Sequence, residues 1–473
     1  MNREKLSAAG EIWRRFLYIV VEFIYGIKCK NLSKIAEMKI ITINMRFYLI
    51  NHCEKQKTGY NKGTDKKFRR MEVNKMLCQF TVKNFKSIRD EVTFDMQAAA
   101  ISEHEDRIIK DTDGELYLPV SAVYGPNGGG KTNVLEALHS LVTKVLRPLY
   151  ATSNSEETAM KMKKVVIEPF AFDEATRNEP TEFELFFRTA LTEYRYELIV
   201  KKEVIEYERL DRIKLETGRK SALFERNKNE IILKGAFTKL KTSDELSDTL
   251  PLLSYLGITY RKNEVVQDVL GWFDEEIDFL NYGNPIQELR MAVSKSEEVK
   301  SLMLQMIQEM DLDIVDFRVE EKEKDQIEVF TKHVVDEFEA ELNLFDESSG
   351  TRKLFGLLPF IAKSLLRGTT LVIDELDAKI HPVLLKYLIM MFGNMKKNKK
   401  GAQLIFTTHN TELMGMDLLR KDQFYFVDKH NADGVSELYS VSELGTRTEE
   451  NIQKNYILGK YGAIPNVEIE EVE

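Results

Sequence analysis

Eight consecutive residues have the types and the spacing that a polyphosphate site needs. They match the pattern G-x-x-x-x-G-K-[ST] and are Gly125, Pro126, Asn127, Gly128, Gly129, Gly130, Lys131 and Thr132. Glycines let successive backbone N–H groups turn inward around phosphate oxygens, and the dipole of a following helix adds to the same field. Lys131 supplies a positive charge to the β- and γ-phosphates, and the Thr132 hydroxyl is a ligand for Mg²⁺. The segment therefore predicts a site for a nucleoside triphosphate with Mg²⁺.

Two carboxylates follow the apolar segment 370–373 far along the chain. Asp374, at the tip of a strand beside the phosphates, can hold Mg²⁺ through water. Glu375 is then placed to activate the attacking water as general base. The alternative is an apolar strand that happens to end in a charged turn, and the upstream phosphate motif disfavours it.

A histidine and a serine–glycine pair extend this set. His409 ends the buried segment 403–407, 34 residues after Glu375, where it can contact the γ-phosphate or simply cap the strand. Ser348 and Gly350 open a predicted helix and could present a hydroxyl and N–H groups to an anion. An ordinary helix N-cap is the simpler explanation for that pair when it is taken alone.

The elements that must position these residues alternate between strands and helices. The pattern predicts strands over 77–85, 91–94, 118–124, 181–188, 193–200, 204–210, 314–319, 326–333, 370–373, 403–407 and 423–427. It predicts helices over 131–145, 263–270, 296–310, 352–366 and 381–392, and a polar loop over 151–157. Such alternation is typical of an α/β fold with a mostly parallel sheet, and the strands of 181–210 are expected to be antiparallel.

Composition and charge exclude several other classes. With 43% hydrophobic and 31% charged residues, the 473-residue chain is neither disordered nor collagen-like. Three cysteines without a C-x-x-C pair build no disulfide framework, so a reducing, cytoplasmic location is expected. The apolar stretch 13–27 is interrupted by Glu22 and is too short to span a bilayer, which argues against integral membrane association.

Charge divides the chain into a basic head and an acidic body. Residues 1–75 carry 17 Lys and Arg against 7 Asp and Glu, whereas the rest carries 51 against 70. A net charge of −19 on the body is not typical of a protein that coats nucleic acid. A local basic groove is still compatible with this charge. Residues 1–75 are interpreted as an accessory extension or a start assigned too far upstream, with a membrane- or partner-binding arm or a targeting segment as alternatives.

The order of the motifs resembles that of ABC-type ATPase heads, including SMC and RecF proteins. The stretch 451–465 (NIQKNYILGKYGAIP) more narrowly resembles AAA-family ATP-binding proteins of the abortive-infection, AbiL-like group, related to OLD-family ATPases. This resemblance implies a P-loop NTPase head with a mostly parallel core sheet, an antiparallel β subdomain and an inserted mixed lobe. The implied divisions are 76–210 and 346–473 for the two ATPase lobes and 211–345 for the insert.

The resemblance also assigns roles to residues. It implies that Ser348 and Gly350 bind the γ-phosphate of ATP held by a second subunit, that Asp377 lies at the dimer seam, and that His409 is the switch histidine. Such proteins act as nucleotide-sandwich homodimers with Mg²⁺ and ATP. Two departures stand out: the signature reads E-S-S-G-T instead of L-S-G-G-Q, and no glutamine occurs between Gln97 and Gln267 to serve as Q-loop ligand. The segment 169–170 occupies the expected place of that loop.

The function expected from this resemblance is an ATPase that drives or gates an effector encoded nearby, in anti-phage defence. One alternative is an ATP-gated DNA-binding or repair protein of the RecF or SMC type, with nucleic acid as the partner. Another is an OLD-type nuclease. Only 64 residues follow His409, and Asp422, Asp428 and Asp433 form no obvious acidic metal cluster, which disfavours the nuclease.

Overall fold

The computed structural model describes residues 75–151, 166–243, 245–280, 296–321, 327–445 and 450–465. The chain divides into two units, Met1–Arg69 and Arg70–Glu473, and all described residues belong to the second. The extension expected over 1–75, apart from Lys75, and the polar loop expected after residue 151 lie outside the described residues.

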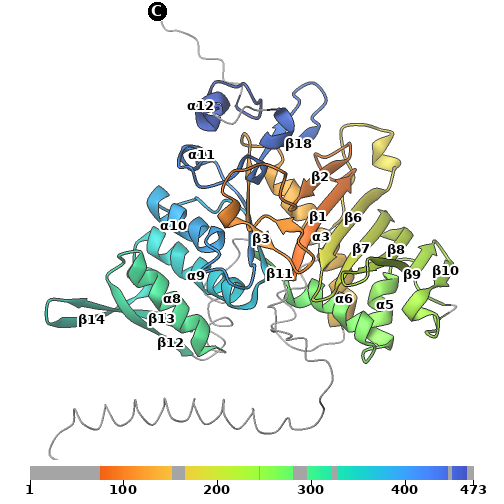
Figure 1. Cartoon of the computed structure of the whole chain (residues 1–473), viewed down its shortest axis with the longest axis horizontal. Coiled ribbons are helices and arrows are strands. Elements are labelled where there is room, and N and C mark those ends of the chain that lie inside the picture. Colours follow the sequence, from red (N-terminus) through yellow and green to blue (C-terminus); the bar gives the residue numbers. More distant parts are fainter. Residues whose placement is uncertain are drawn as a thin grey trace, which may run out of the picture. The chain divides into compact units, whose positions relative to one another are not determined.

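A six-stranded sheet carries the residues singled out above (Figure 1). Its order is β11 (Ile277–Leu280), β15 (Thr370–Ile373), β16 (Gln403–Thr407), β5 (Val120–Tyr124), β17 (Phe424–Lys429) and β18 (Ser436–Ser440). All neighbours are parallel except β17 and β18, which confirms the expected mostly parallel core. Because parallel strands end at one edge, the residues that follow β5, β15 and β16 come together there.

A seven-stranded antiparallel sheet forms a second layer, and alternating burial along β6 shows that one face packs inward. Its order is β10 (Glu230–Leu233), β9 (Arg219–Asn227), β8 (Val204–Lys214), β7 (Thr192–Lys201), β6 (Thr181–Arg188), β1 (Met76–Lys83) and β2 (Val92–Asp95). The expected antiparallel subdomain is therefore present. The boundary drawn at residue 210 falls within β8, and the division into lobes stays a prediction.

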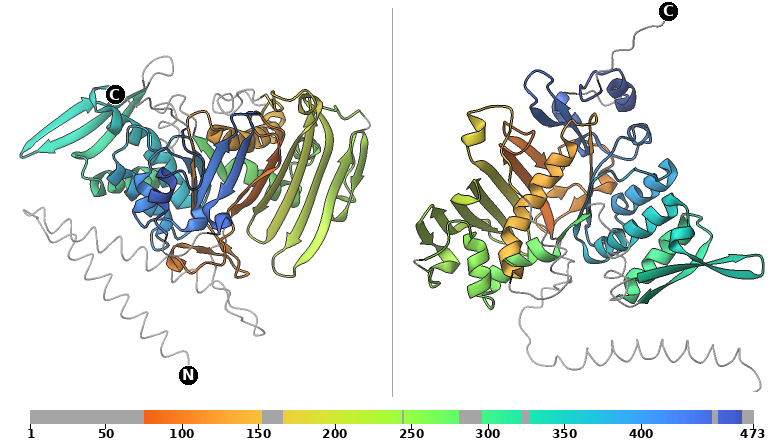
Figure 2. Two further views of the ribbon diagram at one scale, coloured as in Figure 1. Left: turned by 90° about the horizontal axis from the view of Figure 1, so that it is seen from above. Right: turned by 180° about the vertical axis from the view of Figure 1, so that it is seen from behind.

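Helix α3 (Lys131–Tyr150) joins the two layers, as Figure 2 shows. Its Leu138 and Leu141 belong to one buried cluster with Leu185 of the antiparallel sheet and Val372 of the parallel sheet. The helix runs to Tyr150, five residues beyond the expected end. Helices α5 (Leu252–Thr259) and α6 (Glu264–Glu275) belong to the same cluster.

The opposite face of the parallel sheet is covered by α8 (Glu297–Glu309), α9 (Ser349–Arg367) and α10 (Pro382–Gly393). A three-stranded sheet of β12 (Ile314–Glu321), β13 (Ile327–Val335) and β14 (Phe338–Asn343) packs on them, with the Phe317 ring 5.4 Å from that of Phe355. Its β13–β14 hairpin projects beyond α8 (Figure 1). The other strands and α-helices of the described residues are β3 (Ile109–Lys110), β4 (Leu116–Tyr117), α11 (Glu412–Gly415) and α12 (Ile452–Ile457), and short 3-10 helices occur between elements.

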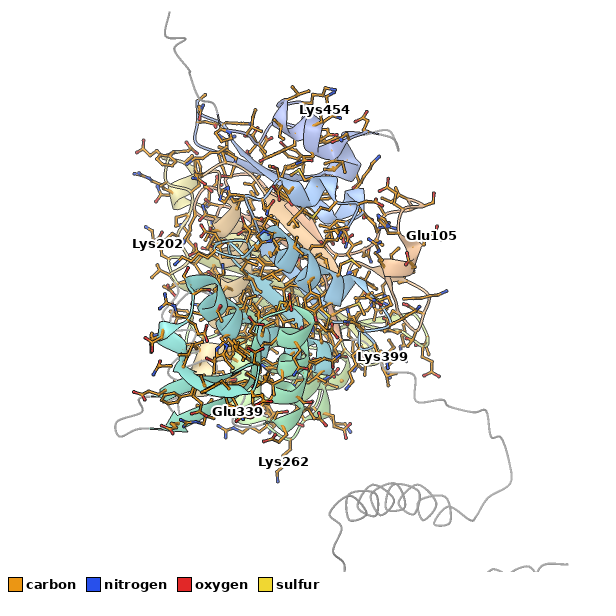
Figure 3. All side chains as sticks on the ribbon, turned by 90° about the vertical axis from the view of Figure 1, so that its left-hand side faces the viewer. Glu105, Lys202, Lys262, Glu339, Lys399 and Lys454 are labelled. Carbon is orange, nitrogen blue, oxygen red and sulfur yellow. The ribbon has the colours of Figure 1, made fainter. Side chains whose placement is uncertain are left out.

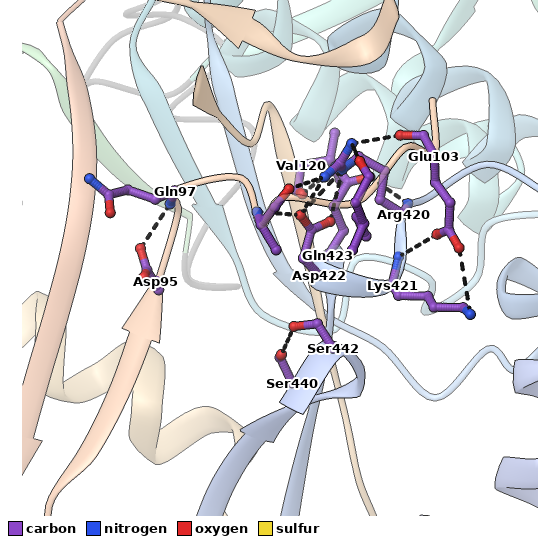
Figure 4. Close-up of polar contacts among 12 residues, drawn as sticks. Asp95, Gln97, Glu103, Val120, Arg420, Lys421, Asp422, Gln423, Ser440 and Ser442 are labelled. Atoms are coloured by element: carbon purple, nitrogen blue, oxygen red, sulfur yellow. Dashed lines mark hydrogen bonds and ion pairs between the residues drawn. The ribbon is translucent and has the colours of Figure 1, made fainter. Parts of the chain in front are cut away.

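A buried ion pair fastens the segment after β2 to the start of β17 (Figure 4). The Arg420 guanidinium donates to the Asp422 carboxylate and to the carbonyl oxygens of Ala99, Ile101 and Glu103. These partners satisfy a fully buried cation, which is costly unless it is paired. Charged side chains such as Glu105 and Lys399 instead point outward (Figure 3).

Candidate functional site: a phosphate-binding loop beside an acidic strand end

The glycine motif joins β5 to α3 along a path that side chains would obstruct. Gly130 has φ +108°, and a Cβ there would lie 2.4 Å from Ser436 Oγ and 2.7 Å from Ser87 Oγ. A Cβ on Gly125 would lie 2.3 Å from the carbonyl oxygen of Val427. Glycine is therefore required at both ends of the loop, which delivers the chain to the N-terminus of α3, where the helix dipole favours an anion.

Lys131, the first residue of α3, folds back over this loop. Its Nζ donates to the carbonyl oxygens of Gly125 and Pro126, each at 3.0 Å. Burial lowers the pKa of Lys131 below its usual value, while the carboxylates of Asp374 and Glu375 raise it. The ammonium group is thus held against the loop carbonyls. There it lies close to the loop N–H groups, where it could pair with an anion bound to them.

Thr132 connects the loop to the acidic strand. Its Oγ1 donates to Asp374 Oδ2 at 2.9 Å, and the Thr407 hydroxyl at the end of β16 donates to the other carboxylate oxygen, Oδ1. Thr132 and Asp374 lie 242 positions apart in sequence, and the parallel pairing of β5, β16 and β15 brings them together. A hydroxyl and a carboxylate are the hard oxygen donors that Mg²⁺ prefers, so this donor set fits the expected cation.

Glu375 adopts an unusual backbone conformation next to Asp374. Its φ is +47°, a left-handed value that costs on the order of 1–3 kcal/mol for a residue other than glycine. Its N–H donates to Thr407 Oγ1 at 2.7 Å, and its carbonyl oxygen accepts from Lys353 Nζ at 2.8 Å. Both backbone groups are therefore held from neighbouring elements, and the exposed side chain leaves the sheet edge at a fixed position.

His409 lies at the same edge, just after β16. Its N–H donates to Asp377 Oδ2 at 3.3 Å, and its exposed side chain lines a cavity of about 1180 Å³ together with the glycine motif. Burial and the Lys131 cation lower the pKa of His409, while Asp377, Glu375 and Asp374 raise it. The lowering prevails, because burial is the largest of these influences.

Ser348 and Gly350 lie at the start of α9 and are not among the described residues that line that cavity. Ser348 Oγ accepts from the Thr351 N–H at 3.1 Å, so within one chain it is an ordinary N-cap. Gly350 packs on the loop after Glu375, where an added Cβ would lie 3.0 Å from the Lys379 carbonyl oxygen. The helix start is nevertheless exposed at Ser348 and at Ser349, its first residue.

The segment at the expected place of the Q-loop has a structural role in this chain. Phe170 is buried, and its N–H donates to Asn84 Oδ1 at 2.8 Å. The Asn84 amide in turn donates to the carbonyl oxygens of Thr176, Glu179 and Pro180. These bonds fix the segment to the end of β1.

Three contributors to the site were not anticipated from the sequence. Thr407 bonds both Asp374 and Glu375, Lys353 holds the Glu375 carbonyl, and Ser436 Oγ donates to the Gly129 carbonyl oxygen at 2.7 Å. A hydroxyl at the last position of a buried strand was a usable signal for Thr407. The other two are recognisable only once α9 and β18 are placed.

A phosphate loop between a parallel strand and a helix, an Asp–Glu pair after β15 and a histidine after β16 define a P-loop NTPase with an ABC-type ATPase head. Residues 120–415 match the family described as "AAA domain, putative AbiEii toxin, Type IV TA system", and the chain belongs to that family. The assignment to the AAA-family ATP-binding proteins of the abortive-infection group is thereby confirmed, and the chain is an ATPase that binds ATP.

Solved structures of SMC heads are similar to the chain at low identity. An SMC head bound to the C-winged helix domain of ScpA is 14% identical, covers 77% of this chain and 97% of its own, and gives a TM-score of 0.42. The SMC head domain from Thermotoga maritima is 17% identical, with 77% and 98% covered and a TM-score of 0.37. The Smc head from Pyrococcus furiosus, with an extended coiled coil and bound to the C-terminal domain of ScpA, is 13% identical, with 82% and 99% covered and a TM-score of 0.39.

A search of curated proteins found no significant match. Within the described part of the chain, no helix is both long and apolar enough to cross a membrane.

Proposed function

We propose that the chain hydrolyses ATP with Mg²⁺ where β5, β15 and β16 end, that ATP joins two copies of it, and that this cycle gates an effector in defence against phage. The Thr132–Asp374 hydrogen bond supports the first part most directly. It brings the hydroxyl of the phosphate loop and the carboxylate of the acidic strand to one point, where a single cation could contact both.

In this proposal the phosphates bind the N–H groups of residues 125–132, and Lys131 turns from the loop carbonyls toward the β- and γ-phosphates. Thr132 and Asp374 would hold Mg²⁺, directly or through water. When bound, Mg²⁺ neutralises charge on the phosphate oxygens. The low exposure of Lys131 favours a tight interaction, because a buried cation gains more from a charged partner than an exposed one does.

Glu375 is the proposed general base. Its carboxylate accepts a proton from the water that attacks the γ-phosphate, and the product is ADP and inorganic phosphate. The fixed backbone of Glu375 supports this role, since a base must be held in one geometry to act on a bound water. His409, whose side chain lines the cavity beside the glycine motif, is proposed to contact the γ-phosphate and to sense its departure.

Dimerisation is proposed through the start of α9 and the loop after β15. Ser348 and Gly350 of one chain would meet the γ-phosphate held by the other, and Asp377 would lie at the seam between the chains. The exposure of the helix start supports this arrangement, because unpaired N–H groups at a helix N-terminus attract anions. The proposed effector and defence role rest on the family description, which names a toxin system.

The decisive experiment compares the wild-type chain with Glu375→Gln. Phosphate release and ATP binding are measured with Mg²⁺ and with EDTA, and Glu105→Gln on an exposed turn is the matched control. We expect Glu375→Gln to bind ATP and to lose about 10²- to 10⁴-fold in turnover, since an amide cannot accept the proton. Turnover at the wild-type rate, or unchanged turnover in EDTA, would contradict the proposal.

A further inference from the structure

The cavity beside the glycine motif is larger than a triphosphate requires. It extends from Gly125–Gly129 to Phe172, to the turn between β17 and β18, and to residues 462–465. Its volume of about 1180 Å³ exceeds the usual range for one small ligand, about 300–1,000 Å³. Phosphate groups would fill only the end of the cavity at the glycine motif. The far end has room for another part of a ligand.

Phe172 presents an exposed aromatic ring at that far end. The residue is 70% exposed, yet its ring is held in place. The ring of buried Phe170 meets it edge to face, with centroids 5.7 Å apart and an interplanar angle of 75°. On another side it lies against Gly434, where an added Cβ would come within 3.0 Å of the ring, and Lys429 Nζ lies 5.8 Å from its centroid. The protein thus holds a large apolar surface in a fixed position facing the cavity.

The Phe172 ring and the phosphate loop line one cavity, and the turn between β17 and β18 contacts both. Ser436 Oγ bonds the Gly129 carbonyl oxygen, and Gly434, which touches the ring, is only two residues before Ser436. Two residues span at most about 7 Å. A ligand whose phosphates lie on the loop can therefore place its base over Phe172, with the ribose between.

Residues 462–465 form a second wall of the same cavity. Tyr439 donates to the Tyr461 carbonyl oxygen at 2.5 Å, and Tyr456 donates to that of Ala463 at 2.8 Å. Gly462 packs so closely on β17 that an added Cβ would lie 2.7 Å from Asp428 Oδ2. This anchoring gives a structural reason for part of the 451–465 stretch, to which the proposed ATPase mechanism assigns no role.

We propose that Phe172 is the platform on which the base of the bound nucleotide stacks, with residues 462–465 closing the base pocket opposite the phosphates. This proposal rests on the proposed ATPase function, because the phosphates set the position of the base. Stacking on an aromatic ring tolerates any base but favours the larger purines, so the expected ligand class is purine nucleoside triphosphates.

The test separates the base from the phosphates by comparing ATP, CTP and inorganic tripolyphosphate as probes. Binding to the full chain with Mg²⁺ is measured by calorimetry for wild type, Phe172→Ala and Phe172→Tyr. We expect Phe172→Ala to bind ATP about 5- to 150-fold more weakly, to bind tripolyphosphate as wild type does, and to lose its preference for ATP over CTP. Phe172→Tyr, which keeps the ring, should bind ATP like wild type.

Two results would overturn the platform while leaving the phosphate site intact. One is unchanged ATP affinity in Phe172→Ala, and the other is an equal loss of ATP and tripolyphosphate, which would place Phe172 at the phosphates. If the wild-type chain bound neither ATP nor tripolyphosphate, the nucleotide site itself would be refuted, and the platform with it.

Discussion

Lys353 Nζ lies 2.8 Å from the carbonyl oxygen of Glu375, so the second turn of α9 is tied to the residue proposed as general base. On its other side, Glu375 donates its N–H to Thr407 at the end of β16. The left-handed backbone of Glu375 is therefore held between the helix that begins at Ser349 and the central sheet. A shift of α9 would move the carboxylate that is proposed to activate water.

The first prediction is that Lys353→Met slows ATP turnover without weakening ATP binding. Loss of the bond to the Glu375 carbonyl frees a strained backbone, and a misplacement of about 1 Å can cost about 100-fold in rate. We therefore expect kcat to fall about 10- to 100-fold, KM to stay within about 2-fold, and Lys353→Arg to keep most of the activity. An equal loss in both variants would argue that α9 packing matters and that the bond does not.

The same lysine predicts an alkaline limit to turnover. Burial lowers the pKa of Lys353 to about 8, Lys379 adds to the lowering, and the carboxylates of Asp377 and Glu375 oppose it. The cation is present below that pH and is lost above it, so kcat should fall as the pH rises through about 8. Arginine stays charged over this range, and Lys353→Arg should remove the fall between pH 7 and 9.5. A profile that is identical in the two proteins would contradict the assignment.

Lys131→Ala should weaken ATP binding itself. Removal of a charge-assisted partner of the phosphates costs about 1.5–3 kcal/mol, or about 10- to 150-fold in affinity. Lys399→Ala, at an exposed position marked in Figure 3, is the matched control and should bind ATP like wild type. Calorimetric titration with Mg²⁺ and ATP measures both. Equal affinities would mean that the phosphates do not lie on this loop.

ATP should bring two chains together when hydrolysis is blocked. Light scattering of Glu375→Gln with Mg²⁺ and ATP is expected to give the mass of a dimer, and the nucleotide-free protein that of a monomer. Adding Ser349→Glu should restore the monomer, because a carboxylate at the exposed helix start would repel phosphate.

Ser349→Ala is the matched control for that variant and should still dimerise. A substitution at Gly350 is less informative, since any side chain there presses on the Lys379 carbonyl within the same chain. A dimer that forms equally well without nucleotide would contradict the sandwich arrangement.

The buried pair of Arg420 and Asp422 should matter for stability and not for chemistry. The two side chains are 0% and 4% exposed, and Arg420→Leu would leave the Asp422 carboxylate buried without its cation. We expect the free energy of unfolding to fall by about 3–5 kcal/mol, as measured by denaturant titration. Arg318→Leu, which breaks an exposed ion pair with Glu341, is the control and should change stability far less. Similar losses of unfolding free energy in the two variants would show that the buried pair stabilises the fold no more than the exposed pair does.

Much of the core could be predicted from short stretches of sequence. The bounds of β15 and β16 agree with the predicted 370–373 and 403–407, because buried parallel strands are runs of apolar residues between polar ends. The glycine motif was recognisable because backbone freedom and the lysine charge belong to consecutive residues. Strands β3, β4, β9, β10, β11, β14 and β18 were not predicted from the sequence. The burial pattern of β14 shows five exposed positions in six, so it carries no alternation of buried and exposed residues to detect.

Contacts between residues that are far apart in the sequence could not be predicted from such short stretches. Thr132 contacts Asp374 because β16 lies between β5 and β15, and Lys353 contacts Glu375 because the first turns of α9 lie beside the end of β15. Strand order is set by the burial of both sheet faces under α3 and α9, which is a property of the whole packed core. The residue types proposed to bind phosphate and to activate water are therefore encoded locally, whereas their geometry, and the placing of Phe172 opposite residues 462–465, arise from long-range packing.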